Sequence, residues 1–308
     1  MELQPLQGAG GRGAARVRML ARIGLALMWL LHFLPLTMLA FCGEWLGLAL
    51  FALARERRRV CLVNLQRCFP DMPAAHRQAL ARRHFRALAR SIVERGILWW
   101  SSRARIARMV TLQGMAHLEA ARARGPVILL APHFVGLDMG WSRLCLDQAL
   151  ASVYANQKNA VMNEALRRGR TRFGPPRLFS RQDGIRPALT ALRDGLPFYY
   201  LPDMDFGPRD AIFVPFFGVP AATITGLSRL ARVAGAKVVP CITRMLPGGA
   251  GYELRCHPAW DNYPTDDVAA DTRRMNAFIE ERVLEMPEQY LWAHKRFKTR
   301  PAGEDKWY

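Results

Sequence analysis

Apolar and polar residues follow a helical spacing in the first third of the chain. Between residues 57 and 101 the apolar positions recur at helical intervals, which predicts helices that bury one face. These positions are Ala81, Phe85, Leu88, Ile92 and Leu98. The opposite face is basic and carries Arg82, Arg83, Arg86, Arg90 and Arg95. Such a stripe is usually solvated, although beside a bilayer it can also hold anionic headgroups.

The spacing changes near residue 109. Short apolar runs typical of strands then alternate with helical stretches, and this alternation predicts an α/β fold with a mixed, largely parallel sheet covered by helices. The expected strands are 109–113, 127–131, 197–201, 211–217, 237–243 and 251–257. The expected helices are 115–124, 139–150, 159–170, 185–193, 223–234 and 267–285. The helical region 57–101 and this α/β core over 109–308 are expected to form one domain, 55–308.

The amino-terminal part divides into a tail and an apolar segment. Residues 1–19 begin with a Gly-rich stretch and lack periodicity, which predicts a disordered tail. The window Ile23–Cys42 contains no formal charge and is interrupted only by His32 and Pro35, and its length matches the hydrocarbon core of a bilayer. Residues 20–54 are therefore expected to be a helical membrane anchor, and a buried helical hairpin is the alternative. Arginines on both sides leave the orientation open.

Charge narrows the range of partners. The 308 residues are 51% hydrophobic and carry a formal net charge of +19, and 39 of the 44 basic residues are arginine. Arginine binds phosphate in a bidentate way, so the excess suits an anionic partner, although genomic base composition also enriches it. Nucleic acid, an anionic membrane surface and an acidic protein all remain open on charge alone. The six cysteines show no Cys-x2-Cys spacing, which indicates neither a metal site nor a disulfide framework.

One constellation points to catalysis. The strand-like run Val127–Ala131 is followed by Pro132, His133 and, five positions later, Asp138. If a helix begins near Gly136, the carboxylate reaches back to the imidazole at the carboxyl end of a strand, where open α/β sheets hold their sites. The pair then predicts a general base, His133, oriented by Asp138. A capping or core histidine is an equally good interpretation of the pair alone.

Further candidates are acidic and basic. Asp203 and Asp205 follow another expected strand in a loop bounded by prolines and glycine, where either substrate positioning or ordinary turn chemistry explains them. Arginines that can bind phosphate cluster near the end of an expected helix and near the carboxyl terminus, where some also favour the helix dipole. They include Arg170, Arg172, Arg296 and Arg300. Walker, Gly-x-Ser-x-Gly and His-Glu-x-x-His motifs do not occur, and no Gly-x-Gly-x-x-Gly motif opens an expected helix, so no cofactor is expected.

Taken together, these motifs resemble the late lipid A acyltransferases, the lauroyl/myristoyl transferase family of Gram-negative bacteria. The likeness runs from about residue 20 to Tyr308. It is carried by Asn64-Leu65 with Cys68-Phe69-Pro70, His133-x4-Asp138, Pro202-Asp203-x-Asp205-x-Gly207-Pro208, Phe213-Val-Pro-Phe-Phe-Gly, Ala222-Thr-x-Thr-Gly226 and Pro287-Glu-Gln-Tyr-Leu-Trp-x-His294-x-Arg296-Phe-Lys-Thr-Arg-Pro301. Many members of the family carry Glu where this chain has Asp138.

The resemblance implies an inner-membrane enzyme whose catalytic domain, 55–308, faces the cytoplasm. Such enzymes transfer a fatty acyl group from acyl carrier protein to the hydroxyl of a hydroxyacyl chain on a Kdo-lipid A precursor. It also links Arg170 and Asp203 to activity, while Arg172, Arg296 and Arg300 are expected to bind anionic substrate groups. The partners are then acyl carrier protein, the lipid A precursor and anionic lipids of the inner membrane.

Two rival functions remain. An acyltransferase of the wider His-x4-Asp superfamily, acting on a glycerol phosphate or a lysophospholipid, uses the same base and orienting acid. A membrane-anchored nucleic-acid-binding protein explains the charge but gives the strand-end His133 and Asp138 no purpose, so no nucleic-acid partner is expected.

Overall fold

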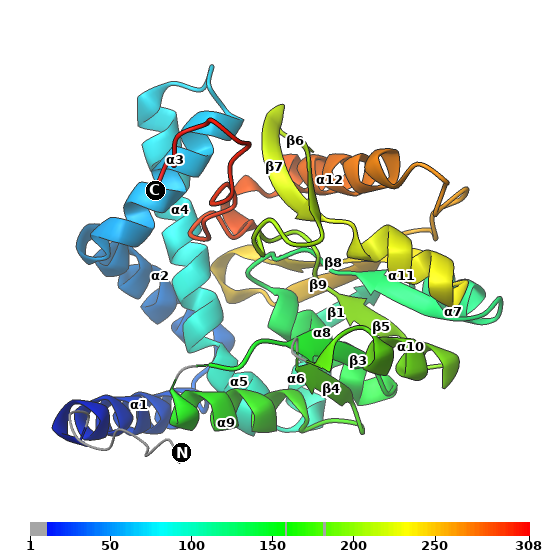
Figure 1. Ribbon diagram of the computed structural model, residues 1–308. Coiled ribbons are helices and arrows are strands. Elements are labelled where there is room, and N and C mark those ends of the chain that lie inside the picture. Colours follow the sequence, from blue (N-terminus) through cyan, green and yellow to red (C-terminus); the bar gives the residue numbers. More distant parts are fainter. Residues whose placement is uncertain (1–10, 158, 181–182) are drawn as a thin grey trace, which may run out of the picture.

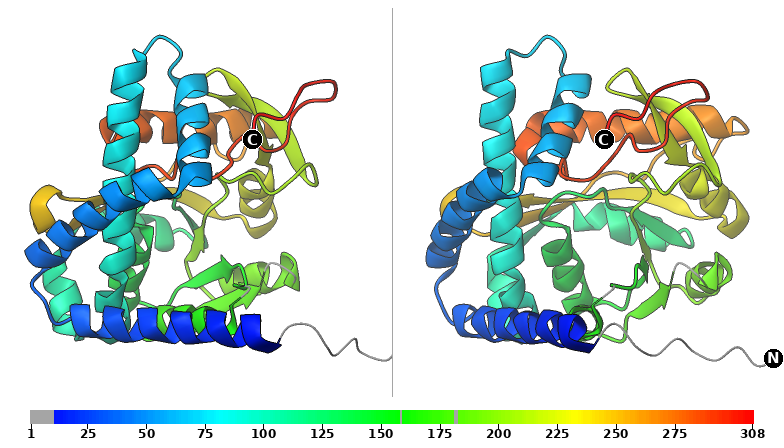
Figure 2. Two further views of the ribbon diagram at one scale, coloured as in Figure 1. Left: turned by 90° about the vertical axis from the view of Figure 1, so that its left-hand side faces the viewer. Right: turned by 60° about the vertical axis from the view of Figure 1, so that its left-hand side comes forward.

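A run of helices comes first in the chain and forms a layer on one side of the molecule (Figures 1 and 2). The computed structural model describes residues 11–308 except residues 158, 181 and 182, so the first ten residues of the expected tail lie outside it. The helices of this layer are α1 (Gly11–Leu31), α2 (Leu36–Leu53), α3 (Arg55–Cys68), α4 (Ala74–Val93), α5 (Arg95–Trp100) and α6 (Arg103–Met109). Because α1 begins at Gly11, the expectation of a disordered tail is wrong for residues 11–19.

The apolar segment is two helices and not one. The window Ile23–Cys42 is divided between α1 and α2 by a turn that ends at Pro35, whose missing amide and fixed φ do not allow the first helix to continue. In the described part of the chain, α2 is the helix long and apolar enough to cross a membrane, and only 22% of it is buried. The uncharged window Ile23–Cys42 therefore does not form one continuous helix, whereas α2 extends beyond it to Leu53.

Helix α2 packs closely on α4 through two glycines one turn apart. A Cβ atom at Gly43 would lie 2.7 Å from the Arg90 Cα, and one at Gly47 would lie 2.5 Å from the Arg86 Cα. Only glycine permits this approach. The basic face expected on α4 is interrupted here, because Arg90 is 4% exposed beneath α2, whereas Ile92, expected to be buried, is 38% exposed.

The sheet follows the helical layer. Within the described residues it has seven strands in the order β1-β9-β8-β2-β5-β3-β4, and every neighbouring pair is parallel except β8 and β9. The strands are β1 (Val110–Gln113), β2 (Val127–Leu130), β3 (Ala151–Tyr154), β4 (Arg177–Ser180), β5 (Phe198–Tyr200), β8 (Lys237–Met245) and β9 (Tyr252–Cys256). The expected mixed, largely parallel sheet is confirmed. The expected strand 211–217 instead forms a separate antiparallel hairpin, β6 (Ala211–Phe216) with β7 (Val219–Ile224).

Helices cover both faces of the sheet (Figure 1). They are α7 (Met115–Arg122), α8 (Leu137–Asp147), α9 (Ala160–Arg170), α10 (Arg186–Arg193), α11 (Gly226–Ala234) and α12 (Val268–Glu285). The central strand β2 shows the layering most clearly. Ile128 and Leu130 pack with α10, α11 and α12, whereas Val127 and Leu129 pack with α7 and α8 on the other face. All four side chains are buried, which explains why β2 reads as a continuous apolar run.

Candidate active site

His133 and Asp203 follow two neighbouring strands of the sheet. His133 comes after β2 and Pro132, and Asp203 comes after β5 and Pro202. Because β2 and β5 are parallel and adjacent, their carboxyl ends lie side by side, at the edge where open α/β sheets hold their ligands. Two residues 70 positions apart in the sequence are thereby brought into contact.

The Asp203 carboxylate holds His133 at two points. One oxygen accepts a hydrogen bond from the His133 backbone amide at 3.0 Å, and the other lies 2.7 Å from the imidazole Nδ1. The Asp203 side chain is 1% exposed and the imidazole 16%. Burial would raise the pKa of Asp203, but the charge of His133 and these hydrogen bonds outweigh burial and lower it. An ionised Asp203 accepts the proton of Nδ1, which leaves the lone pair of Nε2 free.

This contact corrects the expectation that Asp138 orients the imidazole. Asp138 lies in the first turn of α8, where one oxygen is 2.8 Å from Nη2 of Arg170 and the other is 3.1 Å from Nη2 of Arg95. No hydrogen bond or ion pair in the described part of the chain joins Asp138 to His133. The reason is electrostatic, since two guanidinium groups attract a carboxylate more strongly than one imidazole does.

The two arginines keep Asp138 ionised. Its burial would raise the pKa, yet the charges of Arg170 and Arg95, with the hydrogen bond from Arg170, hold the pKa at about 2. The charge of His133 contributes in the same direction, since His133 and Asp138 line the same cavity. The site therefore contains a carboxylate in contact with the imidazole, Asp203, and a second one neutralised by arginine, Asp138.

A cavity of about 950 Å³ opens at this edge of the sheet, and His133, Asp138 and Arg170 line it. Its volume is that of a site for a sizeable small molecule or an alkyl chain. Much of the remaining wall is apolar and includes Leu137, Trp141, Leu178, Ala188, Phe198 and Leu230. Arg209 and Arg229 also line it, and their side chains are 96% and 59% exposed. A second cavity, of about 610 Å³, lies beside Val127 and Pro197 at the opposite ends of the same strands.

Three arginines expected to bind substrate are not part of this cavity wall. Each donates to backbone carbonyl groups of the protein: Arg172 to Leu98 and Trp100, Arg296 to Ala222, and Arg300 to Pro220. All three also lie over aromatic rings, Arg172 over Phe173, Arg296 over Phe216 and Arg300 over Trp307. Of the expected substrate-binding residues, the structure brings only Arg170 and Asp203 together with His133.

Arg95 belongs to the site although the sequence placed it on a solvated helix face. It is the first residue of α5, and its Nη2 lies 3.1 Å from an oxygen of Asp138. The described residues contain no group of three or more His, Cys, Asp or Glu side chains placed to hold a metal ion.

The amino-acid sequence matches a known protein family. A model of the family described as bacterial lipid A biosynthesis acyltransferase matches residues 14–299. The lipid A biosynthesis lauroyltransferase of Escherichia coli is 34% identical over 284 residues, which are 91% of this chain and 92% of that protein. The lipid A biosynthesis palmitoleoyltransferase of the same organism is 32% identical over 287 residues, 92% of this chain and 93% of that protein.

A solved structure also shows a distant likeness. The 1-acyl-sn-glycerophosphate acyltransferase of Thermotoga maritima is 13% identical, and the match covers 81% of this chain and 96% of that one with a TM-score of 0.34. At this level the likeness carries no argument about the acceptor.

Proposed function

Because the chain belongs to the bacterial lipid A biosynthesis acyltransferase family, we propose that it transfers a fatty acyl group from acyl carrier protein to a hydroxyl on a hydroxyacyl chain of a Kdo-lipid A precursor. The observation that carries the proposal is the imidazole of His133, held by Asp203 at the wall of a largely apolar cavity. An aliphatic alcohol is a poor nucleophile near neutral pH, so such a transfer needs a positioned base.

His133 is the general base. Nε2 takes the proton of the acceptor hydroxyl while the hydroxyl oxygen forms a bond to the thioester carbonyl carbon. Asp203, on Nδ1, fixes the tautomer and stabilises the imidazolium, the role of the acid in serine-hydrolase triads. The tetrahedral intermediate then breaks the bond from carbon to sulfur, and the thiolate takes the proton back from Nε2. The products are an ester and the free carrier thiol, and no acyl-enzyme forms.

Asp138 and Arg170 act on the substrate and not on the base. The ion pair between them lies in the cavity wall, where the guanidinium of Arg170 is placed to hold an anionic substrate group or the developing oxyanion. Asp138 keeps this guanidinium fixed, and Arg95 holds Asp138 from the other side. The apolar remainder of the cavity suits the fatty acyl chain.

The exposed arginines at the rim suit the donor. Arg209 and Arg229 line the same cavity and reach into solvent, with only weak contacts of 3.9 Å to Asp210. An acidic carrier protein that delivers its thioester into the cavity would meet both. The rim therefore supports acyl carrier protein as the donor.

The exposed apolar helices suit attachment to a membrane, and we take the inner membrane, with the catalytic domain on the cytoplasmic side, from the resemblance to the family. Large apolar side chains of α1 and α2 are exposed: Val17, Met19, Leu20, Ile23, Leu27, Trp29, Leu30, Met38, Phe41, Trp45, Leu46 and Leu53. Helix α2 lies along α4, whose exposed Arg82, Arg83 and Arg86 would be costly inside hydrocarbon. We infer that α1 and α2 lie in the headgroup region, where these arginines can hold anionic lipids.

The test uses the full chain in membranes or detergent. Acyl carrier protein thioesters are offered with either a Kdo-lipid A precursor or lysophosphatidic acid, and products are identified by mass spectrometry. We expect transfer to the lipid A precursor, its loss by at least about 100-fold in His133→Ala, and its retention in the matched control His76→Ala, a histidine exposed on α4. Transfer to lysophosphatidic acid alone would contradict the lipid A precursor as the acceptor. An active His133→Ala variant would contradict His133 as the general base.

A further inference from the structure

The backbone around His133 is held by a segment near the carboxyl terminus. The amide of Val135 donates to the carbonyl of Gln289 at 2.9 Å, and the amide of Leu291 donates to the carbonyl of His133 at 3.1 Å. Phe134 and Tyr290 between them form an antiparallel bridge, and their rings meet edge to face. The loop that carries the imidazole is therefore paired like a short strand with residues more than 150 positions away.

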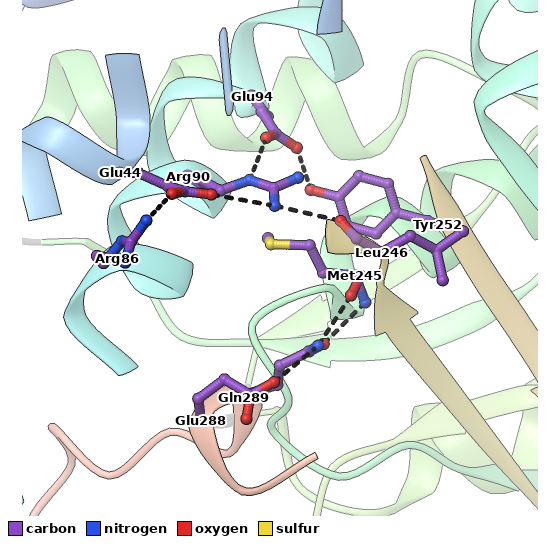
Figure 3. Close-up of polar contacts among 9 residues, drawn as sticks. All are labelled: Glu44, Arg86, Arg90, Glu94, Met245, Leu246, Tyr252, Glu288 and Gln289. Atoms are coloured by element: carbon purple, nitrogen blue, oxygen red, sulfur yellow. Dashed lines mark hydrogen bonds and ion pairs between the residues drawn. The ribbon is translucent and has the colours of Figure 1, made fainter. Parts of the chain in front are cut away.

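Gln289 joins this segment to the sheet. Its side-chain amide forms two hydrogen bonds with the backbone of Met245, the last residue of β8: Oε1 accepts from the amide and Nε2 donates to the carbonyl, both at 2.8 Å. Figure 3 shows the amide lying against the end of β8. Gln289 is 5% exposed, so water does not replace these bonds. The side chain thus fixes Gln289 to the sheet, and its backbone fixes Val135.

The end of β8 is itself held from the opposite side. Arg90 of α4 donates to the carbonyl of Leu246 at 3.2 Å, and its Nε donates to Glu94 at 2.9 Å. Tyr252 of β9 donates to the same carboxylate (Figure 3). These groups are buried, and their bonds leave the backbone at Met245 and Leu246 little freedom to move. Gln289 is therefore attached to a rigid part of the molecule.

Two further side chains fix the segment where it leaves the sheet. His84 on α4 has Nδ1 3.0 Å from the carbonyl of Glu288, and its Nε2 accepts from the amide of Ala293 at 3.3 Å. Asn64 on α3 donates to the carbonyls of Trp292 and His294, both at 2.8 Å. The stretch from Glu288 to His294 is therefore hydrogen-bonded to α3 and α4 on one side and to β8 on the other.

We propose that Gln289 is a positioning residue for His133: it sets the place of the imidazole through the backbone pairing of residues 289–291 with residues 133–135. The inference rests on the proposed function, since it assumes that His133 is the base. Gln289 does not line the cavity, so it acts on the reaction only through this pairing. The segment also lies near Asp203, the residue that holds the imidazole. Burial raises the pKa of Tyr290, and the charge of the nearby Asp203 raises it further.

An amide is the side chain that this position requires. Met245 offers one donor and one acceptor side by side, and glutamine matches both. Glutamate has the same shape but no donor when ionised, so an unpaired carbonyl would face a carboxylate. A shift of the loop by about 1 Å is enough to cost about 100-fold in rate when it misplaces a catalytic group.

The test compares Gln289→Glu with Asn276→Asp. Asn276 is the matched control because its buried amide also donates to a backbone carbonyl, that of Pro215 at 2.9 Å, which belongs to β6 and not to β8. We expect Gln289→Glu to lower kcat about 10- to 100-fold with KM changed less than about threefold, and Asn276→Asp to keep kcat. Hydrogen exchange should quicken in Gln289→Glu at residues 133–135 and 289–291, while β2 and β5 stay protected.

The outcomes separate positioning from stability and from the proposed function. Unchanged kcat in folded Gln289→Glu, or equal losses of kcat in both variants, would overturn the proposal. If Gln289→Glu does not fold, Gln289→Asn, whose shorter amide cannot make both bonds to Met245, takes its place under the same criteria. Hydrogen exchange of the wild-type protein is decisive in that case: Val135 and Leu291 must exchange slowly and at similar rates, and rapid exchange would refute the pairing. A wild-type protein that transfers no acyl group refutes the proposed function, whereas the exchange experiment still tests the pairing.

Discussion

Replacing Asp203 by asparagine separates the two carboxylates of the site. In the wild-type protein the carboxylate of Asp203 accepts two hydrogen bonds, one from the backbone amide of His133 and one from its Nδ1. A carboxamide has one oxygen and one NH2 group, so in either orientation a donor meets a donor. If the NH2 group faces Nδ1, the imidazole changes tautomer and its proton moves to Nε2. A protonated Nε2 can no longer accept the proton of the alcohol.

The size of the effect follows from these contacts. The variant loses a 2.7 Å hydrogen bond to an ionised group together with the charge that stabilises the imidazolium. A general base contributes about 10²–10⁴ in rate, and the same exchange in serine-protease triads costs about 10⁴. We therefore expect Asp203→Asn to lower kcat by about 10²–10⁴, equivalent to about 3–5 kcal/mol of transition-state stabilisation.

The assay measures kcat and KM for transfer from an acyl carrier protein thioester, with Asp138→Asn beside it. Asp138→Asn keeps the imidazole oriented but leaves Arg95 and Arg170 without their shared anion, so we expect a higher KM or a less stable protein and a smaller loss of kcat. If Asp203→Asn keeps kcat within about tenfold while Asp138→Asn loses far more, Asp138 is the orienting acid and the geometric argument is refuted.

Three further predictions concern stability, pH and the donor. Glu94→Ala removes the carboxylate 2.9 Å from the buried Arg90 and leaves only the more distant Glu44, at 3.9 Å, as its counter-ion. The free energy of unfolding should therefore fall by about 3–5 kcal/mol in chemical denaturation, whereas a loss below about 1 kcal/mol would contradict the buried pair. Burial lowers the pKa of His84 from its ordinary 6.5 to about 4, so its contribution to stability is complete above pH 6.5 and is lost as the pH falls toward 4. This amounts to about 3 kcal/mol, and unfolding of His84→Gln between pH 7 and pH 4.5 should be correspondingly less pH-dependent than that of the wild type. Arg229→Glu should raise KM for acyl carrier protein thioesters about 3- to 10-fold without raising it for acyl-pantetheine. Equal shifts of KM for both donors would contradict a contact between the rim arginines and acyl carrier protein.

The hydrophobic pattern predicted most of the elements, because strands and helices that bury a face carry a regular spacing. The expected strand 127–131 and helix 159–170 correspond to β2 and α9. The strands β3 and β4 were missed, since Ala151–Tyr154 and Arg177–Ser180 are short and partly exposed and lack an apolar run. β7 was missed because Val219–Ile224 begins beside prolines that suggest a turn.

Local sequence determined that His133 follows a buried strand beside a proline, and that Asp138 falls in the first turn of the next helix. It could not determine which carboxylate the imidazole meets, because this depends on β5 lying beside β2 in the sheet and on α5 and α9 bringing Arg95 and Arg170 to Asp138. A contact between residues 133 and 203 leaves no trace in the spacing of either segment. Strand order and helix packing, which bury side chains from distant parts of the chain together, decided the chemistry of the site.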